Sequence, residues 1–418
     1  MKNNHTPEIR FPGFTGDWEQ CKLGDTADFS KGNGYSKSDL TDEGKPVILY
    51  GRLYTRYETV IESVDTFTIE KDKSVISKGN EVIVPASGET SEDISRASVV
   101  SKPGIILGGD LNIIRPSNEI DPIFLALTIS NGKQKKELSK RAQGKSVVHL
   151  HNSDLKEVNL LFPKKEEQIK IGKFFKQLDD TIALHQQELT TLKQTKQGFL
   201  QKMFPKEGES VPEFRFPGFT GDWEQRRFEN VLNKQDGIRR GPFGSALKKE
   251  FFVKDSDYAV YEQQNAIYDN YETRYNITKE KFEELKNFQL SEGDFILSGA
   301  GTIGRISRVP KGIKQGVFNQ ALIRFKIDEN ITDSEYFVQW IRSANMQRKL
   351  TGANPGSAMT NLVPMSEVKK WDVMVPSKNE QIKIGKFFKQ LDEMIALQQR
   401  DLDVLKETKK AFLQKMFT

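Results

Sequence analysis

The sequence predicts a mixed α/β protein in which a variable domain followed by a long helix occurs twice in tandem. Three observations lead to this expectation. A short motif is repeated almost unchanged, a long helical block is repeated almost unchanged, and the stretches between them share almost no identity. We therefore expect a variable domain at 1–166, a helix at 167–204, a second variable domain at 205–379 and a second helix at 380–418.

The composition is that of a chain with much exposed surface. Hydrophobic residues make up 36% of the 418 residues and charged residues 29%, and the net charge is +5. This mild positive charge permits nucleic acid as a partner without requiring it. The single cysteine, Cys21, excludes an intramolecular disulfide and a cysteine-rich zinc site. Neither an apolar signal core nor a run approaching the roughly 20 residues of a membrane span is present, so we expect a cytoplasmic protein without a membrane partner.

The two repeated blocks behave as a fixed frame. Residues 7–20 read PEIRFPGFTGDWEQ, and residues 212–225 differ from them at one position. Residues 167–204 begin EQIKIGKFFKQLD and end FLQKMF, and residues 380–417 begin and end identically. A duplication followed by unconstrained drift does not explain why these blocks stayed alike while the regions between them diverged. A protein that reads two different targets with one architecture would have this organisation.

The long block has the apolar spacing of a coiled-coil helix, because intervals of three, four and seven residues fit a 3.5-residue repeat. Pro163 and Pro376 stand just before the two helices, and no proline interrupts either one. At 1.5 Å per residue each block forms a rod of roughly 55–60 Å, whose apolar stripe needs a partner. The expected seam residues are Ile171, Phe175, Leu178, Ile182, Leu189 and Leu192 in the first helix and Ile384, Phe388, Leu391, Ile395, Leu402 and Leu405 in the second.

The other copy is the economical partner for each helix, and we expect the pair to be antiparallel. That arrangement would place the variable domains at opposite ends under a pseudo-two-fold axis, although the intervening domain is long enough for a parallel pair as well. Lys196 and Lys409 fall at matching seam positions, where polar residues can fix register. Phe174 and Phe387 lie off the seam, and we expect them to offer a face to another protein. Plain oligomerisation stalks are the alternative.

Both variable regions indicate mixed α/β structure. Apolar runs that follow glycine turns predict matching strands at 79–84 and 293–297, and helices are expected at 122–130 and 334–343.

Several loops in these regions combine arginine, lysine, tyrosine, asparagine and glutamine. Arginine suits guanine, asparagine and glutamine suit adenine, and glycine or serine amides suit phosphates. Recurrence of such loops at corresponding places favours DNA contact over a merely solvated surface. The candidate DNA-binding residues are Lys31, Tyr35, Arg52, Tyr54, Arg56, Arg141, Gln143 and Lys145 in the first region and Arg239, Arg240, Gln264, Asn265, Thr302, Arg305, Asn354 and Ser357 in the second.

No catalytic motif survives closer inspection. Residues 299–304 match G-x-G-x-x-G, but a β-like run follows where a dinucleotide site needs a helix. Residues 144–146 lack the first glycine of a P-loop, and Asp121-Pro122-Ile123-Phe124 is better explained as a helix cap than as a methyltransferase motif. His149 and His151 have no carboxylate cluster beside them. We therefore expect no catalytic residue, no metal site and no cofactor in this chain.

The organisation resembles the specificity subunit of a type I restriction-modification system. Each helix opens with a Pro-x-x-x-Glu-Gln motif, which reads PKKEEQ at 163–168, with one extra residue, and PSKNEQ at 376–381. The resemblance covers essentially the whole chain and is carried by the helix blocks and the two-copy order. It implies two target-recognition domains that each read one half of a split DNA site, and an antiparallel helix pair that acts as a ruler between them. If so, residues inserted just after Phe204 should change the gap between the half-sites.

The same resemblance implies the partners. These are double-stranded DNA, two methyltransferase subunits that carry S-adenosylmethionine and methylate adenine N6, and two restriction and translocase subunits that use ATP and magnesium. The chain would then be a non-catalytic component. Half-sites one DNA turn apart, roughly 34 Å, lie within the reach of such a rod. The alternatives are a coiled-coil adaptor with two ligand-binding domains and a stand-alone enzyme.

Overall fold

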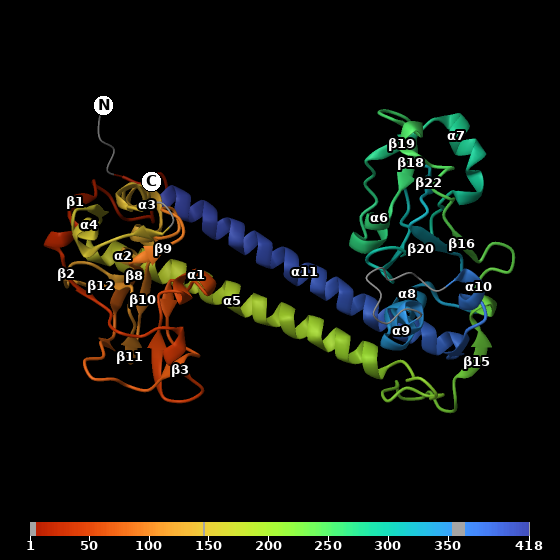
Figure 1. Ribbon diagram of the computed structural model, residues 1–418, viewed down its shortest axis with the longest axis horizontal. Coiled ribbons are helices and arrows are strands. Elements are labelled where there is room, and N and C mark those ends of the chain that lie inside the picture. Colours follow the sequence, from red (N-terminus) through yellow and green to blue (C-terminus); the bar gives the residue numbers. More distant parts are fainter. Residues whose placement is uncertain (1–5, 145–146, 353–363, 418) are drawn as a thin grey trace. The chain divides into compact units, whose positions relative to one another are not determined.

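The computed structural model describes residues 6–144, 147–352 and 364–417 and contains two compact units. Both long helices, α5 (Lys165–Lys202) and α11 (Lys378–Met416), are divided between the units (Figure 1). The first unit extends to Gln187 and takes in the chain again from Gln399, and the second unit comprises the residues between. Each unit therefore combines one variable domain with part of each helix, whereas the division expected from the sequence kept helices and domains apart.

The first variable domain is built on two interleaved sets of strands. One sheet has the order β2-β12-β8-β10-β5 and another has the order β3-β6-β4-β11-β7. The strands are β1 (Glu19–Lys22), β2 (Ala27–Lys31), β3 (Leu40–Thr41), β4 (Lys45–Ile48), β5 (Val60–Ile61), β6 (Phe67–Thr68), β7 (Ile76–Lys78), β8 (Glu81–Pro85), β9 (Ser87–Gly88), β10 (Ser98–Val100), β11 (Pro103–Leu107), β12 (Leu111–Pro116), β13 (Val148–His149) and β14 (Asn159–Phe162). The helices are α1 (Arg52–Thr55), α2 (Pro122–Ser130), α3 (Gly132–Arg141) and α4 (Asn152–Lys156).

The second variable domain repeats this plan. Its sheet β16-β23-β20-β21 corresponds to β2-β12-β8-β10, and a second sheet has the order β17-β19-β18-β22. The strands are β15 (Glu224–Arg227), β16 (Ile238–Arg240), β17 (Phe252–Val253), β18 (Tyr258–Tyr261), β19 (Tyr275–Ile277), β20 (Phe295–Ser298), β21 (Ile306–Arg308), β22 (Gly316–Phe318), β23 (Leu322–Phe325) and β24 (Asp372–Val375). The helices are α6 (Gln263–Tyr268), α7 (Lys279–Glu284), α8 (Ser334–Arg342), α9 (Ala344–Thr351) and α10 (Met365–Val368).

The matching strands expected at 79–84 and 293–297 are β8 and β20, which occupy equivalent inner positions in the two sheets. Both strands are buried along their whole length, which explains why their sequences are continuous apolar runs rather than alternating ones. Helix α2 packs against β8 and β10 of the same sheet. The sequence therefore located the centre of each domain correctly.

The ends of each variable domain are joined by one antiparallel strand pair. β1, at the end of the short motif, pairs with β14, which leads into α5, and β15 pairs in the same way with β24, which leads into α11. Entry and exit of each domain therefore lie side by side at the start of a long helix.

Helices α2 and α8 begin at aspartate caps, as the sequence indicated for the first of them. The Asp121 carboxylate accepts hydrogen bonds from the amides of Ile123 and Phe124, both at 3.0 Å, and the Asp333 carboxylate accepts one from the Tyr336 amide at 2.9 Å. The Asp-Pro-Ile-Phe stretch is therefore a helix start. The 299–304 glycine motif is followed by strand β21, which also agrees with the rejection of a dinucleotide site.

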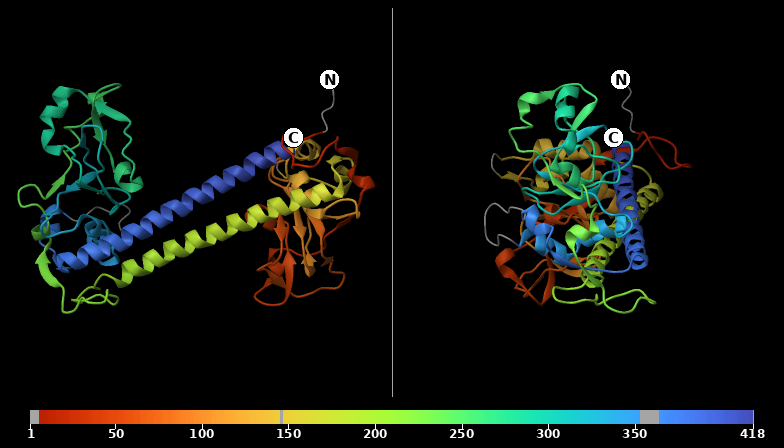
Figure 2. Two further views of the ribbon diagram at one scale, coloured as in Figure 1. Left: turned by 180° about the vertical axis from the view of Figure 1, so that it is seen from behind. Right: turned by 90° about the vertical axis from the view of Figure 1, so that its right-hand side faces the viewer.

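The core of each unit contains the start of one long helix and the end of the other (Figure 2). In the first unit the Phe175 ring of α5 lies 6.0 Å from the ring of Phe417, which follows α11. In the second unit the Phe388 ring of α11 lies 6.1 Å from the ring of Phe204, which follows α5. These contacts can form in both units only if the helices pair antiparallel, and this confirms the expected direction. Within the described residues, the helices offer no apolar stretch sufficient to span a bilayer.

Equivalent glycines allow the start of each long helix to approach the cap of its domain. A Cβ at Gly385 would lie 2.7 Å from the Tyr336 amide nitrogen and 2.8 Å from an Asp333 carboxylate oxygen. A Cβ at Gly172, in the first copy, would lie 3.0 Å from the equivalent oxygen of Asp121. Backbone atoms cannot move aside as a flexible side chain can. The close approach at Gly385 therefore depends on glycine more strongly than the one at Gly172.

We predict that Gly385→Ala lowers the free energy of unfolding of the second unit by about 1–3 kcal/mol, because overpacking outweighs the gain in helix propensity. The matched control is Gly198→Ala in α5, where a Cβ would meet no atom within 4 Å. That substitution should stabilise the helix by up to about 1 kcal/mol. Urea unfolding followed by tryptophan fluorescence measures both changes, and equal stabilisation by the two substitutions would contradict the close approach.

Candidate nucleic-acid interface

A buried ion pair attaches the repeated short motif to the start of each long helix. The Arg10 guanidinium donates from Nε and Nη2 to the two Glu167 carboxylate oxygens at 2.6 and 2.7 Å. Arg215 donates to Glu380 in the same way, at 2.7 Å for both bonds. Each glutamate side chain is only 1% exposed. A bidentate pair fixes angle as well as distance, so the helix start is held in one orientation on its domain.

The glutamine that follows each glutamate joins the same helix start to the domain's aspartate-capped helix. The Gln168 side chain donates to the Pro163 and Glu119 carbonyls at 2.8 and 3.1 Å and accepts from the Asp121 amide at 2.8 Å. The same three bonds link Gln381 to the Pro376 carbonyl, the Ile331 carbonyl and the Asp333 amide. Because both glutamines are buried and fully bonded, the Glu-Gln motif is a structural joint.

The phenylalanines off the seam belong to this joint. The Phe174 ring meets Phe11 of the short motif edge-on at 5.6 Å and Phe412 of α11 at 5.2 Å. The Phe387 ring makes the corresponding contacts with Phe216 and Phe199 at 5.7 and 5.0 Å. The expectation that Phe174 and Phe387 offer a face to another protein is therefore wrong, because the short motif already packs against that face.

The lysines at matching seam positions bind carboxylates of the opposite helix. In the second unit Lys196 lies 2.5 Å from a carboxylate oxygen of Asp392, whose other oxygen accepts from the Gln339 amide at 3.1 Å. In the first unit Lys409 pairs with Asp179, which also accepts from the Thr59 hydroxyl at 3.0 Å. Each aspartate thus connects both helices and the adjoining domain.

Burial in this position lowers the pKa of Lys196, and only its pairing with Asp392 opposes that effect. A one-residue slip of either helix would therefore leave a partly buried ammonium without its carboxylate, a costly state. These pairs give a physical basis for the register that polar seam residues were expected to fix.

The expected seam residues lie on the inner sides of the helices to different depths. Leu189 and Leu402 are 2% and 1% exposed, so they are as buried as the seam residues that belong to the domain cores. Ile171, Phe175, Ile384, Phe388 and Leu391 are also buried, whereas Leu178, Ile182, Leu192, Ile395 and Leu405 are half-buried. A pair of helices without a covering domain shields its seam incompletely.

Among the candidate DNA-binding residues of the first domain, Lys31, Arg56 and Gln143 are exposed. Lys31 ends the edge strand β2, whereas Arg56 forms an exposed ion pair with Asp65 at 2.7 Å. The Gln143 backbone forms a bridge with His149, so its side chain is presented by a fixed backbone. Half-buried Arg141 ends α3 and pairs with Glu137 of that helix at 2.9 Å, and Lys145 lies outside the described residues.

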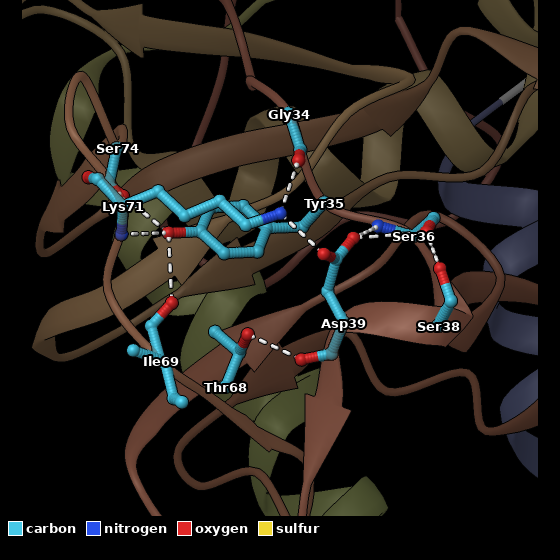
Figure 3. A network of polar contacts seen from close by, with 9 residues as sticks. All are labelled: Gly34, Tyr35, Ser36, Ser38, Asp39, Thr68, Ile69, Lys71 and Ser74. Carbon is cyan, nitrogen blue, oxygen red and sulfur yellow. Dashed lines mark hydrogen bonds and ion pairs between the residues drawn. The ribbon is translucent and has the colours of Figure 1, made fainter.

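The structure corrects the assignment of Tyr35. Its side chain is 8% exposed, and its hydroxyl contacts the Ser74 hydroxyl at 2.5 Å and accepts from the Lys71 amide at 2.7 Å. The Lys71 ammonium lies 4.9 Å from the ring centre and also pairs with Asp39 (Figure 3). Together with the bonds from Ser36, this ammonium lowers the pKa of Asp39 to about 2. Tyr35 thus lies at the centre of a network of polar contacts within the fold, and its side chain does not face solvent.

Arg52 and Tyr54 are likewise held by the fold. The Arg52 side chain is 8% exposed and pairs with Glu58 at 2.7 Å and Asp65 at 2.9 Å. The Tyr54 hydroxyl donates to the Ser87 carbonyl at 2.9 Å, and burial raises the pKa of this hydroxyl. The Arg52 Nη atoms and the Tyr54 hydroxyl, which we expected to contact bases, are therefore already bonded within the fold.

In the second domain Arg240, Thr302 and Arg305 are exposed, and Gln264 is half-buried. Arg239 is partly exposed, and its guanidinium donates to Asp236 at 3.0 and 3.1 Å. Asn354 and Ser357 lie outside the described residues.

The assignment of Asn265 is corrected as well, because this side chain is 1% exposed. Its oxygen accepts from the Glu262 amide at 2.7 Å, and its nitrogen donates to the Asn270 and Glu272 carbonyls at 2.7 and 3.0 Å. It therefore closes the turn around α6.

A basic cleft of about 640 Å³ lies within the second unit. Residues of α5, of α6 and of the loop before β21 line it, and its cations are Lys193, Lys196, Arg305 and Arg342. Lys196 and Arg342 face Asp392, whereas Lys193 and Arg305 are exposed. Arg305 was among the residues predicted from the sequence, whereas Lys193 was not, although its position outside the seam indicated an exposed cation.

In the part of the chain that the structure describes, no three histidine, cysteine, aspartate or glutamate side chains are grouped so that they could hold a metal ion. The His149 and His151 rings are stacked with centres 6.4 Å apart, and the His149 Nδ1 lies 3.2 Å from the Ser87 hydroxyl.

Comparisons with known proteins agree with this architecture. A family model for the type I restriction modification DNA specificity domain matches residues 15–194 and 221–407. The protein assigned as the specificity subunit of the MjaX type I restriction enzyme of Methanocaldococcus jannaschii is 22% identical, over 96% of this chain and 93% of its own length.

Two solved structures share the fold over nearly the whole chain. The type I restriction-modification system S subunit from M. genitalium gives a TM-score of 0.59 at 14% identity and covers 99% of each chain. A structure concerned with complex assembly and conformational transition of the type I R-M system gives a TM-score of 0.56 at 14% identity and covers 98% of each chain.

We predict that Lys196 and Asp392 are energetically coupled by about 1–2 kcal/mol, because their charged hydrogen bond is shielded from solvent on the lysine side. A double-mutant cycle of Lys196→Met and Asp392→Asn, measured by urea unfolding, gives this value. The control cycle uses Lys202→Met and Glu213→Gln, whose pair is as close, at 2.7 Å, but whose side chains are 58% and 49% exposed. Its coupling should stay below about 1 kcal/mol, and equal couplings in the two cycles would refute the register role.

Proposed function

Since the chain belongs to the type I restriction-modification DNA specificity family, we propose that each of its two recognition domains reads one half of a bipartite DNA site. Provision of DNA sequence specificity is the function of this family, and the chain is its non-catalytic component. The observation that carries the two-half-site proposal is that the residues that hold the two domains are the same, while the surfaces of the domains differ. The same ion pair, glutamine and glycine hold both domains, while the exposed polar residues of the domains differ.

The surfaces fit DNA in a manner specific to each domain. Lys31 and Gln143 are available on the first domain, and Arg240, Thr302 and Arg305 on the second. Arginine and glutamine can distinguish base edges, while lysine and backbone amides hold phosphates. The basic cleft beside Arg305 adds Lys193 of α5 to the phosphate-binding surface.

The antiparallel helix pair serves as the ruler between the half-sites. Its register is supported in the first unit by Lys409 with Asp179 and in the second by Lys196 with Asp392. Because Phe204 is buried against Phe388, however, residues inserted just after Phe204 would lengthen only the connection and leave the helix pair unchanged. Contrary to the sequence-based expectation, an insertion at that junction should therefore leave the gap between the half-sites unchanged.

The partners are double-stranded DNA, two methyltransferase subunits and two restriction and translocase subunits, acting in the cytoplasm. Leu184 and Leu397 occupy equivalent positions on the two helices, and both are 55% exposed. An exposed leucine of this kind on each copy supports one methyltransferase docking site per helix. S-adenosylmethionine belongs to those subunits, and ATP and magnesium belong to the restriction subunits. A coiled-coil adaptor is not favoured, because the family model covers both domains.

Exchange of residues 22–166 for the recognition domain of another family member should change one half-site and leave the other unchanged. The reason is that the residues that hold this domain from outside it, such as Gln168 and Asp179, belong to the repeated blocks and are retained in the exchange. Adenine methylation mapped across a host genome, with the methyltransferase subunit supplied, reads both half-sites at once. If both half-sites changed, the modular account would be wrong.

Seven residues inserted into each helix, after Gln187 and after Gln398, should lengthen the gap between half-sites by up to about three base pairs. One heptad keeps the seam in phase and adds roughly 10 Å of helix. The control carries the same seven residues just after Phe204 and should keep the original gap. Methylation mapping decides the outcome, and a gap that is insensitive to the paired insertion would remove the ruler role.

A further inference from the structure

Phe243 is the most solvent-exposed large hydrophobic side chain in the part of the chain that the structure describes, at 88% exposure. It lies in the loop that follows β16 of the second recognition domain. A single exposed apolar residue is unremarkable by itself. Here, however, the loop around it is anchored in a way that holds the ring outward.

The backbone on both sides of Phe243 is packed against the domain. Pro242 is buried, and the Gly241 amide donates to the Leu322 carbonyl at 3.0 Å. The Ala246 amide donates back to the Phe243 carbonyl at 2.8 Å, which closes a turn, and Leu247 packs on an apolar cluster. The exposed ring therefore projects from a turn that lies between buried Pro242 and partly buried Leu247.

Two glycines make this packing possible. A Cβ at Gly241 would lie 1.9 Å from the Asn319 carbonyl oxygen, and a Cβ at Gly244 would lie 2.8 Å from the Gln320 side-chain oxygen. At Gly241 the loop thus approaches the turn before β23 too closely for any larger residue, because the obstacle is backbone, whereas at Gly244 a larger residue would require the Gln320 side chain to move.

Basic residues flank the loop in sequence. Arg239 and Arg240 precede the loop, and Lys248 and Lys249 follow it. Asp236 pairs with Arg239 and Glu250 pairs with Lys248, so Arg240 and Lys249, both exposed, carry the charge that these carboxylates leave unneutralised. An aromatic ring between cations suits a nucleic acid, which offers phosphates beside stacked bases.

Two other aromatic residues of the chain differ from Phe243 in exposure or in flanking charge. Tyr268 is also highly exposed, at 76%, but its neighbour in sequence is Asp269, and Glu272 follows shortly after. In the first domain the loop after the equivalent strand β2 carries Tyr35, which is turned inward and buried. Of these three aromatic residues, only Phe243 is both highly exposed and in a loop that basic residues flank in sequence.

We propose that Phe243 is an apolar wedge that stacks against or between bases of the half-site read by the second recognition domain, with Arg240 and Lys249 on the neighbouring phosphates. The inference rests on the proposed function and adds to it a contact residue of a different kind, which reads the deformability of a base step rather than hydrogen-bonding groups. The first domain, whose Tyr35 is buried, would read its half-site without such a wedge.

The test uses the full chain in complex with its methyltransferase subunit and a duplex that carries the bipartite site found by methylation mapping. Phe243→Ala should weaken binding between about fivefold and a hundredfold, the range for loss of one aromatic stacking contact. It should leave the slope of log K against log salt unchanged, whereas Lys249→Ala should reduce that slope by about one. Tyr268→Ala, the matched exposed aromatic, should bind like the unsubstituted chain.

A second variant reports the wedge directly. Phe243→Trp should keep binding, and iodide should quench its added fluorescence less in complex with the specific duplex than in complex with a duplex whose second half-site is scrambled. The wedge would be overturned if Phe243→Ala bound DNA as tightly as the unsubstituted chain, or if Tyr268→Ala lost as much affinity as Phe243→Ala. It would also be overturned if Phe243→Ala weakened binding only because the complex lost its methyltransferase subunit. Failure of the unsubstituted chain to bind any site specifically would instead overturn the proposed function, and this inference with it.

Discussion

The buried pair between a short-motif arginine and the glutamate at the start of each long helix is the contact on which the rest of the structure depends. Arg10 with Glu167, and Arg215 with Glu380, fasten a helix to the strand pair where its domain begins and ends. Because each carboxylate is almost completely buried, no water can replace the guanidinium, and loss of either partner would leave an unpaired charge inside the protein. This constraint explains why the short motif and the helix block stayed alike in both copies.

Such a joint separates two requirements that a reader of a split DNA site must meet. The orientation of each recognition domain on the helices is set by the repeated residues, with Asp179 and Asp392 connecting both helices to the adjoining domain. The loops that face solvent take no part in these contacts, so their sequences can change without disturbing the frame. Sequence preference and spacing can therefore vary independently, and tandem duplication of one unit is sufficient to produce an asymmetric target.

Features determined by local sequence were predicted well. Helix α2 begins and ends where proline, aspartate and apolar spacing placed it, and β8 and β20 are the central strands that the glycine-led apolar runs indicated. Contact residues were harder, because a polar residue in a loop looks the same whether it faces DNA or the fold. Arg52 is held by Asp65, thirteen positions away, and such partners meet only in the folded chain. The exposure of Phe243 likewise depends on the distant turn that packs under its loop.

The most direct test of the account is a map of adenine methylation in a host that has the methyltransferase subunit, with and without this chain. The account predicts methylation at a single split motif that appears only when the chain is present, with two half-sites of unrelated sequence at a constant separation. A methylation pattern that does not depend on the chain, with folded protein and co-expression verified, would contradict the claim that it supplies the DNA address.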